Sequence, residues 1–350
     1  MAWGFCFAIS AWSCHRACVP ANRLLQHYVD NARRLPWRAM PGEPAPDPYR
    51  VWLSEVMLQQ TTVAAVAPRF ERFVERWPTA EALASAPDED VLSEWAGLGY
   101  YARARNLIAC AREVAKRGGI PDTESELRKL PGIGDYTAAA IAAIAFGRHA
   151  AVIDTNVARV ISRFRGLEKT VDESREEIRR IVEAITPADQ PGDFAQAMMD
   201  LGATICRPKA PECVRCPLST DCIAYASGEP ERYPAPKPKA ARPTRHGVAW
   251  WIERDGCVWL VRRPGKGMLG GMAALPGTEW SDTPAGSAPA LGRVTHVFTH
   301  FRLELAIAAK GEPEGEGWWQ PTDRLEQAGL PTLYRRAADA VLTSRTKLAA

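Results

Sequence analysis

The cysteines between positions 206 and 222 restrict the fold of this chain more than any other feature. Cys206, Cys213, Cys216 and Cys222 have six, two and five residues between them. Four thiolates in one loop can hold a [4Fe–4S] cluster or a tetrahedral zinc ion, whereas disulfides would be spread more evenly along the chain. Zinc loops usually contain two close pairs, and Cys213 with Cys216 is the single close pair here. The spacing therefore favours the cluster modestly and indicates a reducing compartment.

The rest of the chain divides into a helical part and a mixed part. With 350 residues, and about 150 residues per domain, there is room for two or three domains. Residues 21–225 contain periodic segments of helical length separated by turn sequences. Residues 226–246 are rich in proline and basic residues, which predicts an extended linker. Residues 247–350 contain β-rich runs around an Asp255-Gly256 hairpin signal and then a helical pattern, which predicts an α+β domain.

The N-terminal segment and the net charge exclude little. Residues 1–20 are apolar, but positive charge follows the apolar run instead of preceding it. We therefore interpret them as an uncertain extension and not as a secretion signal. No segment is long and apolar enough to predict a membrane span, and we expect a cytoplasmic protein. The net charge of +3 permits a nucleic-acid partner without arguing for one.

Residues 130–137, LPGIGDYT, join two helical patterns. Gly132 and Gly134 allow a tight turn with positive φ and no side chain in the way. Such a turn ahead of a helix presents backbone N–H groups at the positive end of the helix dipole, which suits a DNA phosphate. A plain turn with a glycine cap is the alternative, and the alanine-rich helix that follows favours the phosphate site.

Two acidic residues have apolar sequence neighbours. Glu55 lies at helical spacing from Val51 and Trp52. If it is buried, its pKa rises and it stays protonated, whereas a surface glutamate beside the apolar stripe is an equal alternative. Asp154 precedes a helical pattern as an N-cap, where the helix dipole should lower its pKa. A neutral acid paired with an ionised carboxylate is what cleavage of a glycosidic bond requires.

Together these features resemble the MutY family, the adenine DNA glycosylases of the helix-hairpin-helix (endonuclease III) superfamily. The matching stretches are LPWR (35–38), VWLSEVMLQQT (51–61), GLGYYARARNL (97–107), LPGIGDYTA (130–138), IDTNVARV (153–160), FAQAMMDLGATIC (194–206) and the cysteine loop. The resemblance implies a six-helix barrel over residues 50–148 and a cluster-bearing lobe made of residues 21–49 and 149–225. It also implies a [4Fe–4S] cluster on the four cysteines and removal of adenine mispaired with 8-oxoguanine.

The resemblance assigns roles to individual residues. Glu55 would protonate adenine N7. Asp154 would stabilise or trap the sugar cation, assisted by Tyr136 and Asn156. A flipped base leaves a gap that a side chain should fill. The residues that would enter the DNA stack or contact 8-oxoguanine are Gln60, Thr61, Leu98 and Tyr100. The basic residues after them either face phosphates or form a solvated helix face; they are Arg103, Arg105, Arg112, Lys116 and Arg117.

Residues 247–350 resemble the Nudix-like domain of the same family more weakly. The acid-rich helix with which a Nudix hydrolase holds metal is missing after Pro276, so we expect no nucleotide hydrolysis. The glycine loop also carries Leu269 where the family usually has tryptophan.

The stretch THVFTH (295–300) matches the family loop that reads 8-oxoguanine. The match places Phe298, Thr299 and His300 at the damaged base. Thr299 stands where serine is usual; the hydroxyl is kept and a methyl group is added.

Three other functions fit part of the pattern. An endonuclease III-type lyase would need a lysine where Tyr136 stands. A thymine–guanine mismatch glycosylase shares the tyrosine but does not need the C-terminal domain. A non-catalytic iron–sulfur DNA-binding protein would explain the cysteines but neither Glu55 nor Asp154. The fullest match is a monofunctional glycosylase. We expect it to act as a monomer at a bacterial-type nucleoid, on double-stranded DNA with adenine opposite 8-oxoguanine or guanine.

Overall fold

The computed structural model describes residues 20–237, 241–265, 267–284 and 290–349. The expected N-terminal extension therefore lies outside the described residues except for Pro20. The chain forms two compact units, each built from two segments. One contains residues up to 59 together with 117–238, and the other contains residues 60–116 together with the C-terminal part from 239. The division thus runs through the helical region.

Four helices form the centre of the first unit: α2 (Pro48–Leu58), α8 (Asp135–Phe146), α9 (Thr155–Arg165) and α11 (Pro191–Thr204). α8 packs against both α2 and α11, and α11 also packs against α9. The alanine-rich sequence of α8 allows this close packing, because its small side chains are buried on all faces of the helix. The remaining helices of this unit are α1 (Ala21–Asn31), α7 (Glu124–Leu127), α10 (Arg175–Ile185) and α12 (Ile223–Ala226), with 3₁₀ turns η1 (Cys213–Arg215), η2 (Ser219–Asp221) and η3 (Pro230–Arg232).

The second unit begins with the helices α3 (Val63–Arg76), α4 (Ala80–Ala84), α5 (Asp88–Trp95) and α6 (Ala102–Arg117). Phe73 of α3 packs edge-on against Trp95 of α5, with ring centroids 6.0 Å apart. None of the described helices of the chain is both long enough and apolar enough to span a membrane.

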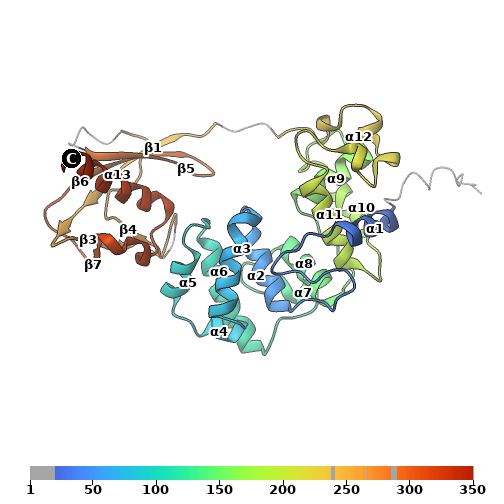
Figure 1. Cartoon of the computed structure of the whole chain (residues 1–350), viewed down its shortest axis with the longest axis horizontal. Coiled ribbons are helices and arrows are strands. Elements are labelled where there is room, and N and C mark those ends of the chain that lie inside the picture. The colour runs from blue at the N-terminus through green and yellow to red at the C-terminus, as the bar shows by residue number, and fades with distance from the viewer. Residues whose placement is uncertain (1–19, 238–240, 266, 285–289, 350) are drawn as a thin grey trace, which may run out of the picture. The chain divides into compact units, whose positions relative to one another are not determined.

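The C-terminal strands of the second unit form two sheets (Figure 1). The strands are β1 (Thr244–Trp251), β2 (Glu253–Arg254), β3 (Cys257–Arg262), β4 (Ala273–Ala274), β5 (Ala290–Val297), β6 (Arg302–Ala309) and β7 (Trp318–Pro321). In the first sheet β6 lies between β1, to which it is parallel, and β5, to which it is antiparallel. In the second sheet β3 pairs with β2, β4 and β7. The fold class predicted from sequence, a mostly helical part followed by an α+β part, is confirmed.

The hairpin predicted at Asp255 and Gly256 is confirmed, because these two residues join the antiparallel strands β2 and β3. Their φ angles are 48° and 73°, the left-handed values that two-residue hairpins require. β1 begins at Thr244, inside the segment expected to be linker.

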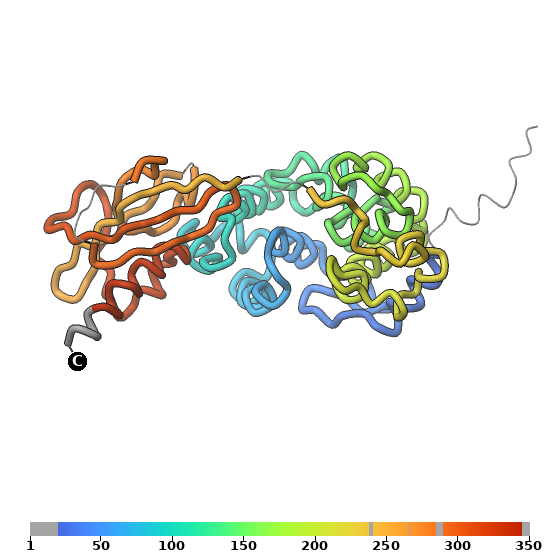
Figure 2. The backbone as a smooth tube through the Cα atoms, turned by 90° about the horizontal axis from the view of Figure 1, so that it is seen from above, coloured from blue at the N-terminus to red at the C-terminus, as the bar shows by residue number. Residues whose placement is uncertain are grey.

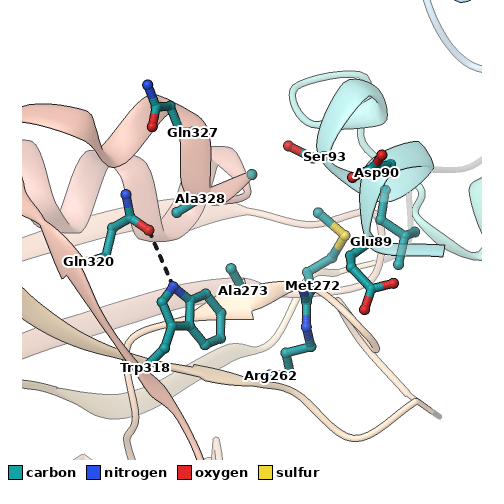
Figure 3. Close-up of a pocket in the computed structure, with 12 residues that line it drawn as sticks. Glu89, Asp90, Ser93, Arg262, Met272, Ala273, Trp318, Gln320, Gln327 and Ala328 are labelled. Atoms are coloured by element: carbon teal, nitrogen blue, oxygen red, sulfur yellow. Dashed lines mark hydrogen bonds between the residues drawn. The ribbon is translucent and has the colours of Figure 1, made fainter. Parts of the chain in front are cut away.

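A hollow of about 220 Å³ lies between α5 and the sheet of β3, β4 and β7 (Figure 3). Glu89, Asp90 and Ser93 line it from α5, and Trp318 and Gln320 line it from the opposite side. The indole Nε1 of Trp318 donates to Gln320 Oε1 over 3.2 Å. The walls are therefore largely polar.

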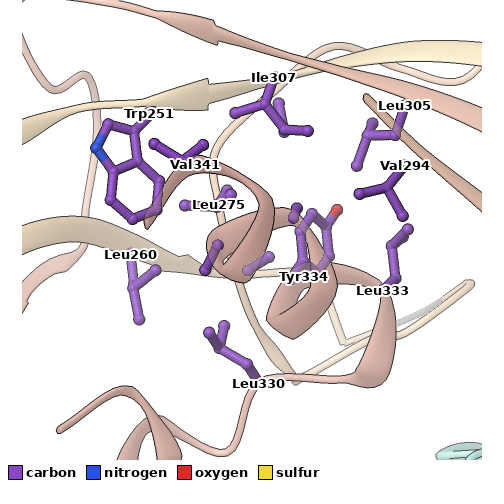
Figure 4. Close-up of a cluster of buried hydrophobic side chains, with 14 of the residues drawn as sticks. Trp251, Leu260, Leu275, Val294, Leu305, Ile307, Leu330, Leu333, Tyr334 and Val341 are labelled. Atoms are coloured by element: carbon purple, nitrogen blue, oxygen red, sulfur yellow. The ribbon is translucent and has the colours of Figure 1, made fainter. Parts of the chain in front are cut away.

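The core of the C-terminal domain lies between α13 (Thr332–Ala349) and the strands (Figures 2 and 4). A short 3₁₀ segment, η4 (Thr322–Ala328), leads into this helix. The largest buried side chain of this core is Trp251. The other core side chains labelled in Figure 4 include Leu260, Val294, Leu305, Ile307, Leu333, Tyr334 and Val341. This apolar interior fixes the helix against β5 and β6.

Candidate active site

Glu55 lies on α2 and is buried, with 6% of its surface exposed. α2 begins at Pro48, after Asp47 accepts hydrogen bonds from the N–H groups of Tyr49 and Arg50. The surrounding α2 positions are buried too, so the interpretation of Glu55 as a surface residue is wrong. Burial raises the pKa of Glu55 to about 7, although a hydrogen bond from Tyr136 opposes the rise.

Tyr136, in the first turn of α8, donates its hydroxyl to Glu55 Oε2 over 2.6 Å. The family resemblance assigns Tyr136 to Asp154, whereas the structure gives its hydrogen bond to Glu55, because α2 and α8 pack together. The same hydroxyl lies 3.5 Å from Met199 Sδ on α11. The two predicted acidic residues nevertheless influence one another, since the negative charge of Asp154 adds to the rise of the Glu55 pKa.

Asp154 is the N-cap of α9, as its sequence position predicts. Its carboxylate accepts from the backbone N–H of Val157 over 2.7 Å and from Asn156 Nδ2 over 2.8 Å. The expectation of a lowered pKa is wrong. Burial raises the pKa of Asp154, and this effect outweighs the hydrogen bonds from Val157 and Asn156 that lower it.

A buried ion pair lies near Glu55. Arg38 Nη1 contacts Asp200 Oδ2 over 2.7 Å, with 7% and 9% of the two side chains exposed. Arg33 donates to the other carboxylate oxygen over 2.6 Å. The positive charge of Arg38 lowers the pKa of Glu55 and so limits the rise caused by burial. The LPWR motif predicted no such role, because Asp200 is distant in sequence.

Arg159 connects the Asp154 site to the cysteine loop, which the sequence did not reveal. Its guanidinium donates to Asn156 Oδ1 over 2.8 Å and to the Cys206 carbonyl over 2.8 Å. It also donates to the carbonyl of Gly202 over 2.7 Å. A side chain at Gly202 would come within 2.5 Å of Asn156 Cβ, so glycine is needed for this approach of α11 to α9.

Gln196 is another residue without a predicted role. It is 5% exposed, and its amide oxygen has no hydrogen-bond partner among the described residues. Gln196 precedes Met199 by three positions on α11 and thus shares its helix face. A buried acceptor without a partner among the described residues suits a ligand with an N–H donor.

The four cysteines of the loop are free thiols. Burial raises the pKa of Cys216 to about 12, and the neighbouring cysteines add to the rise. Arg163 Nη1 lies 3.4 Å from Cys206 Sγ. Within the described ranges, no three His, Cys, Asp or Glu side chains form a site for a single metal ion. A [4Fe–4S] cluster is several atoms wide, so its ligands need not converge on one point.

The glycine turn ahead of α8 uses positive φ at Gly132, where φ is 75°. Gly134 is extended, with φ of −90° and ψ of −179°, and is the N-cap of α8. Apart from Gly134 and its two chain neighbours, none of the described residues has an atom within 4 Å of the place where a Gly134 side chain would begin. The turn therefore leaves open space at the positive end of α8, as a phosphate site needs.

In the second unit, Gln60 and Tyr100 have φ angles of 54° and 49°. Positive φ is uncommon for residues other than glycine and concentrates at functional sites. Tyr100 is 45% exposed, so its ring is available to a partner. Leu98 is 6% exposed, so its side chain packs inside the fold instead of facing DNA. Thr61 accepts a hydrogen bond from Arg103 Nη2 over 3.0 Å.

The segment of basic residues does not form one uniform phosphate-facing surface. Arg103 is 9% exposed and also donates to the carbonyls of Leu98 and Gly99, so it lies neither on a solvated helix face nor free to face phosphates. Arg112 forms an ion pair with Asp88. Arg105 donates to the carbonyl of Gly270.

The predicted reading loop, Phe298 to His300, joins β5 and β6. Phe298 packs against Phe301, with ring centroids 4.8 Å apart, and against Trp280 and His296. Its ring therefore anchors the loop to the domain. Thr299 and His300 are exposed, and the Thr299 hydroxyl lies 3.1 Å from the Tyr100 hydroxyl.

Comparisons with known proteins agree with this geometry. A family model described as HhH-GPD superfamily base excision DNA repair protein matches residues 53–187, and a NUDIX domain model matches residues 247–340. Human adenine DNA glycosylase is 33% identical over 84% of this chain and 69% of its own length. The mouse adenine DNA glycosylase is also 33% identical, over 85% of this chain and 73% of its length. That of Mycolicibacterium smegmatis is 40% identical over 59% of this chain and 70% of its length.

Two solved structures resemble the helical part. A thermostable thymine-DNA glycosylase has a TM-score of 0.55 and 29% identity, covering 62% of this chain and 100% of its own. Endonuclease III in a non-covalent DNA complex has a TM-score of 0.51 and 25% identity, covering 59% of this chain and 94% of its own.

Proposed function

The chain belongs to the adenine DNA glycosylases of the helix-hairpin-helix superfamily, and we propose that it removes adenine paired with 8-oxoguanine or guanine without cutting the DNA strand. Membership makes it an N-glycosyl hydrolase of base excision repair that acts on DNA. One observation carries the residue assignment: Glu55 is buried, accepts a hydrogen bond from Tyr136, and has a pKa of about 7 to which the charge of Asp154 contributes. That is the environment of a carboxylic acid that gives up a proton at neutral pH.

Glu55 acts as the general acid in this proposal. An ordinary glutamate is ionised at pH 7, whereas a pKa of about 7 keeps a large fraction of Glu55 protonated. Tyr136 donates to Oε2, which leaves Oε1 to carry the proton. The proton passes to N7 of the flipped adenine. The electron pair of the bond between the sugar and N9 then leaves with the base, and a cationic sugar remains.

Asp154 stabilises that sugar cation. Its carboxylate is held in place by the Val157 N–H and the Asn156 amide at the start of α9. Burial raises its pKa, but a positive sugar beside it favours the ionised form. Water adds to the sugar carbon and gives up one proton to the ionised Glu55, which restores the acid and leaves an abasic site. Gln196 Oε1, a buried acceptor without a partner among the described residues, is suited to the exocyclic amine of adenine.

The absence of strand cutting follows from Tyr136. A lyase forms an imine between a lysine amine and the sugar, and a phenol cannot form one. Lys129 lies before the glycine turn and forms an ion pair with Glu126. We therefore propose hydrolysis as the sole reaction of this site.

A [4Fe–4S] cluster fits the four cysteines between 206 and 222. The thiols are free, burial raises the pKa values of Cys213, Cys216 and Cys222, and the charge of Cys206 adds to each of these rises. Thiolates gathered in this way need a compensating positive charge. When bound, the cluster supplies that charge and ties the loop together. Arg163 holds the loop by donating to the Arg207 carbonyl over 2.6 Å and to the Pro208 carbonyl over 3.0 Å.

Recognition of the opposite base falls to the second unit. Gln60 and Tyr100, with their positive φ angles, would enter the gap left by the flipped adenine. Thr299, on the exposed tip of the loop and in contact with Tyr100, would contact the 8-oxoguanine. A threonine hydroxyl can donate or accept, so it can distinguish the altered base edge. The turn of Gly132 and Gly134 would hold a backbone phosphate.

A panel of four duplexes tests the proposed substrate. Each carries adenine opposite 8-oxoguanine, guanine, cytosine or thymine, and adenine release is measured under single-turnover conditions. We expect release opposite 8-oxoguanine to be fastest, guanine to be second, and the other two to be negligible. A fifth duplex with thymine opposite guanine tests the thymine glycosylase alternative; release of thymine without adenine would overturn the proposal.

A further inference from the structure

Arg105 and the glycine turn of the C-terminal domain form a contact that no proposed step of the reaction uses. Arg105 Nη1, on α6, donates to the carbonyl oxygen of Gly270 over 2.5 Å. Gly270 is buried, so its carbonyl requires a partner within the protein. A guanidinium donor makes the bond charge-assisted and thus stronger than a bond between neutral groups.

The Gly270 carbonyl is held rigidly within its own domain. The turn closes on itself, because Gly270 N–H donates to the Gly267 carbonyl and Met272 N–H donates to the Leu269 carbonyl. Arg263 braces the turn from within the domain. Its Nε donates to the Met268 carbonyl, and its Nη1 lies 2.9 Å from the Tyr334 hydroxyl of α13. A bond to Gly270 therefore fixes the whole domain and not a loose loop.

The same helical segment also contacts the reading loop. Tyr100 lies two residues before α6, and its hydroxyl meets Thr299 at 3.1 Å. Phe298 is packed into an aromatic cluster, so Thr299 moves with its domain. Both contacts join the start of α6 to the C-terminal domain. A change at the Arg105 contact must therefore alter where Thr299 lies relative to Tyr100.

Two further close approaches lie where α5 and α6 meet the C-terminal domain, which we call the joint. Ser93 of α5 meets Gly329, where an added side chain would come within 3.0 Å of Ser93 Cα. A side chain added at Gly271 would likewise come within 3.5 Å of Leu92 Cδ1. Between these contacts lies the polar hollow of about 220 Å³, whose walls do not pack together (Figure 3). The hollow leaves these side chains without packing partners on one side, so the direct contacts around it carry more of the attachment.

We propose that Arg105 is a positioning residue for opposite-base specificity, because its bond to Gly270 sets the position of Thr299 against Tyr100. The proposal rests on the proposed recognition of 8-oxoguanine by the C-terminal domain. It gives Arg105 no contact with the base. The competing role is a phosphate contact by Arg105, which would carry no information about the opposite base.

The test compares adenine release opposite 8-oxoguanine and opposite guanine for wild-type protein, Arg105→Ala, Arg105→Lys and a control, Lys116→Ala, on the same helix. The measured quantity is the ratio of the two single-turnover rates at saturating protein. We expect Arg105→Ala to lower the ratio about tenfold, the effect of losing one charge-assisted hydrogen bond. Arg105→Lys should restore part of the ratio, and Lys116→Ala should leave it unchanged.

A second variant disturbs the joint without changing charge. Ser93→Tyr places a large side chain where α5 meets Gly329 and should also lower the ratio. A phosphate contact predicts a different result: Arg105→Ala would weaken binding of both duplexes equally and reduce the salt slope by about one unit, while Ser93→Tyr would do nothing. That pattern, with an unchanged ratio, would overturn the proposal.

A double variant connects Arg105 to Thr299. If Arg105 acts through the loop, Arg105→Ala should have little further effect on the ratio in a Thr299→Ala background. Additive effects would contradict the proposal. Failure of the underlying function looks different: wild-type protein would itself show no preference between 8-oxoguanine and guanine. Thermal unfolding of each variant confirms that the chain remains folded.

Discussion

Tyr136 donates its hydroxyl to Glu55 over 2.6 Å, although the two residues lie 81 positions apart in the chain. The bond orients the acid and, by favouring its charged form, lowers the pKa that burial has raised. In Tyr136→Phe the pKa of Glu55 should therefore rise further. The rate of adenine release falls as Glu55 ionises, so the pH at which this alkaline limb begins should shift from about 7 to a higher value. The plateau rate should fall about tenfold because Glu55 loses its orientation.

The measurement is the single-turnover rate from pH 5 to 9. Tyr225→Phe, which removes the hydroxyl of an exposed tyrosine on α12, is the matched control and should leave both the plateau and the limb unchanged. A limb that moves downward in Tyr136→Phe would show that the bond does not favour the charged form of Glu55.

The raised pKa of Glu55 also makes a prediction about stability. The folded-state pKa of about 7 exceeds the ordinary value of 4.5, so the folded state holds the proton more tightly than the unfolded state. The stability contribution of Glu55 is therefore fully present below pH 4.5 and is lost as the pH rises through 7. Glu55→Gln cannot ionise. The free energy of unfolding of Glu55→Gln, minus that of wild type, should therefore increase by about 3 kcal/mol from pH 4.5 to pH 7.

Urea unfolding of both proteins at pH 5 and at pH 8 measures this difference. Other titrating groups are common to the two proteins and cancel in the comparison. A constant difference across the range would show that Glu55 is not the buried acid described above.

Arg159 should influence catalysis without contacting DNA. Its bonds to Asn156 and to the Cys206 carbonyl join the Asp154 site to the cysteine loop. We expect Arg159→Ala to slow adenine release at least about tenfold, because Asn156 loses the partner that orients its amide toward Asp154. Duplex binding and iron content should stay close to wild type. Arg179→Ala, at an exposed position of α10, is the control. An unchanged rate in Arg159→Ala would remove the proposed connection.

Replacement of one loop cysteine tests whether the loop holds a [4Fe–4S] cluster or a zinc ion. Cys216→Ser should lose most of its iron and sulfide and lose duplex binding, since three thiolates hold a [4Fe–4S] cluster poorly. Cys257→Ser, on β3 and outside the loop, should keep the full content of both. Iron and acid-labile sulfide per chain are the quantities measured. Zinc instead of iron in the wild-type protein would refute the cluster.

Local sequence signals predicted some features well. The Asp255-Gly256 hairpin follows from turn chemistry alone, because both residues must adopt positive φ. The N-cap at Asp154 is equally local. The sequence did not decide whether Glu55 is buried, since helical periodicity does not say which neighbouring element covers the apolar face of the helix. α8 covers it, and its alanine-rich sequence makes that close packing possible.

Relationships across long stretches of chain were not predictable. The Arg38–Asp200 ion pair and the Arg159 contacts join residues whose own sequence contexts carry no special pattern. The pKa of Asp154 was predicted in the wrong direction, because an N-cap position says nothing about how deeply the carboxylate is buried. The parallel pairing of β1 with β6 is non-local in the same sense, since β2, β3, β4 and β5 lie between them in the chain.

A buried, protonated Glu55 should expel adenine while the DNA strand stays whole. The decisive measurement is free adenine released at pH 6 from a duplex with adenine opposite 8-oxoguanine, for wild type and Glu55→Gln, together with strand integrity before alkali treatment. Wild type should release one adenine per abasic site with the strand intact. Glu55→Gln should bind the duplex with similar affinity and be slower by about a thousandfold or more. Comparable adenine release by Glu55→Gln, or strand cleavage by wild type before alkali, would contradict this mechanism.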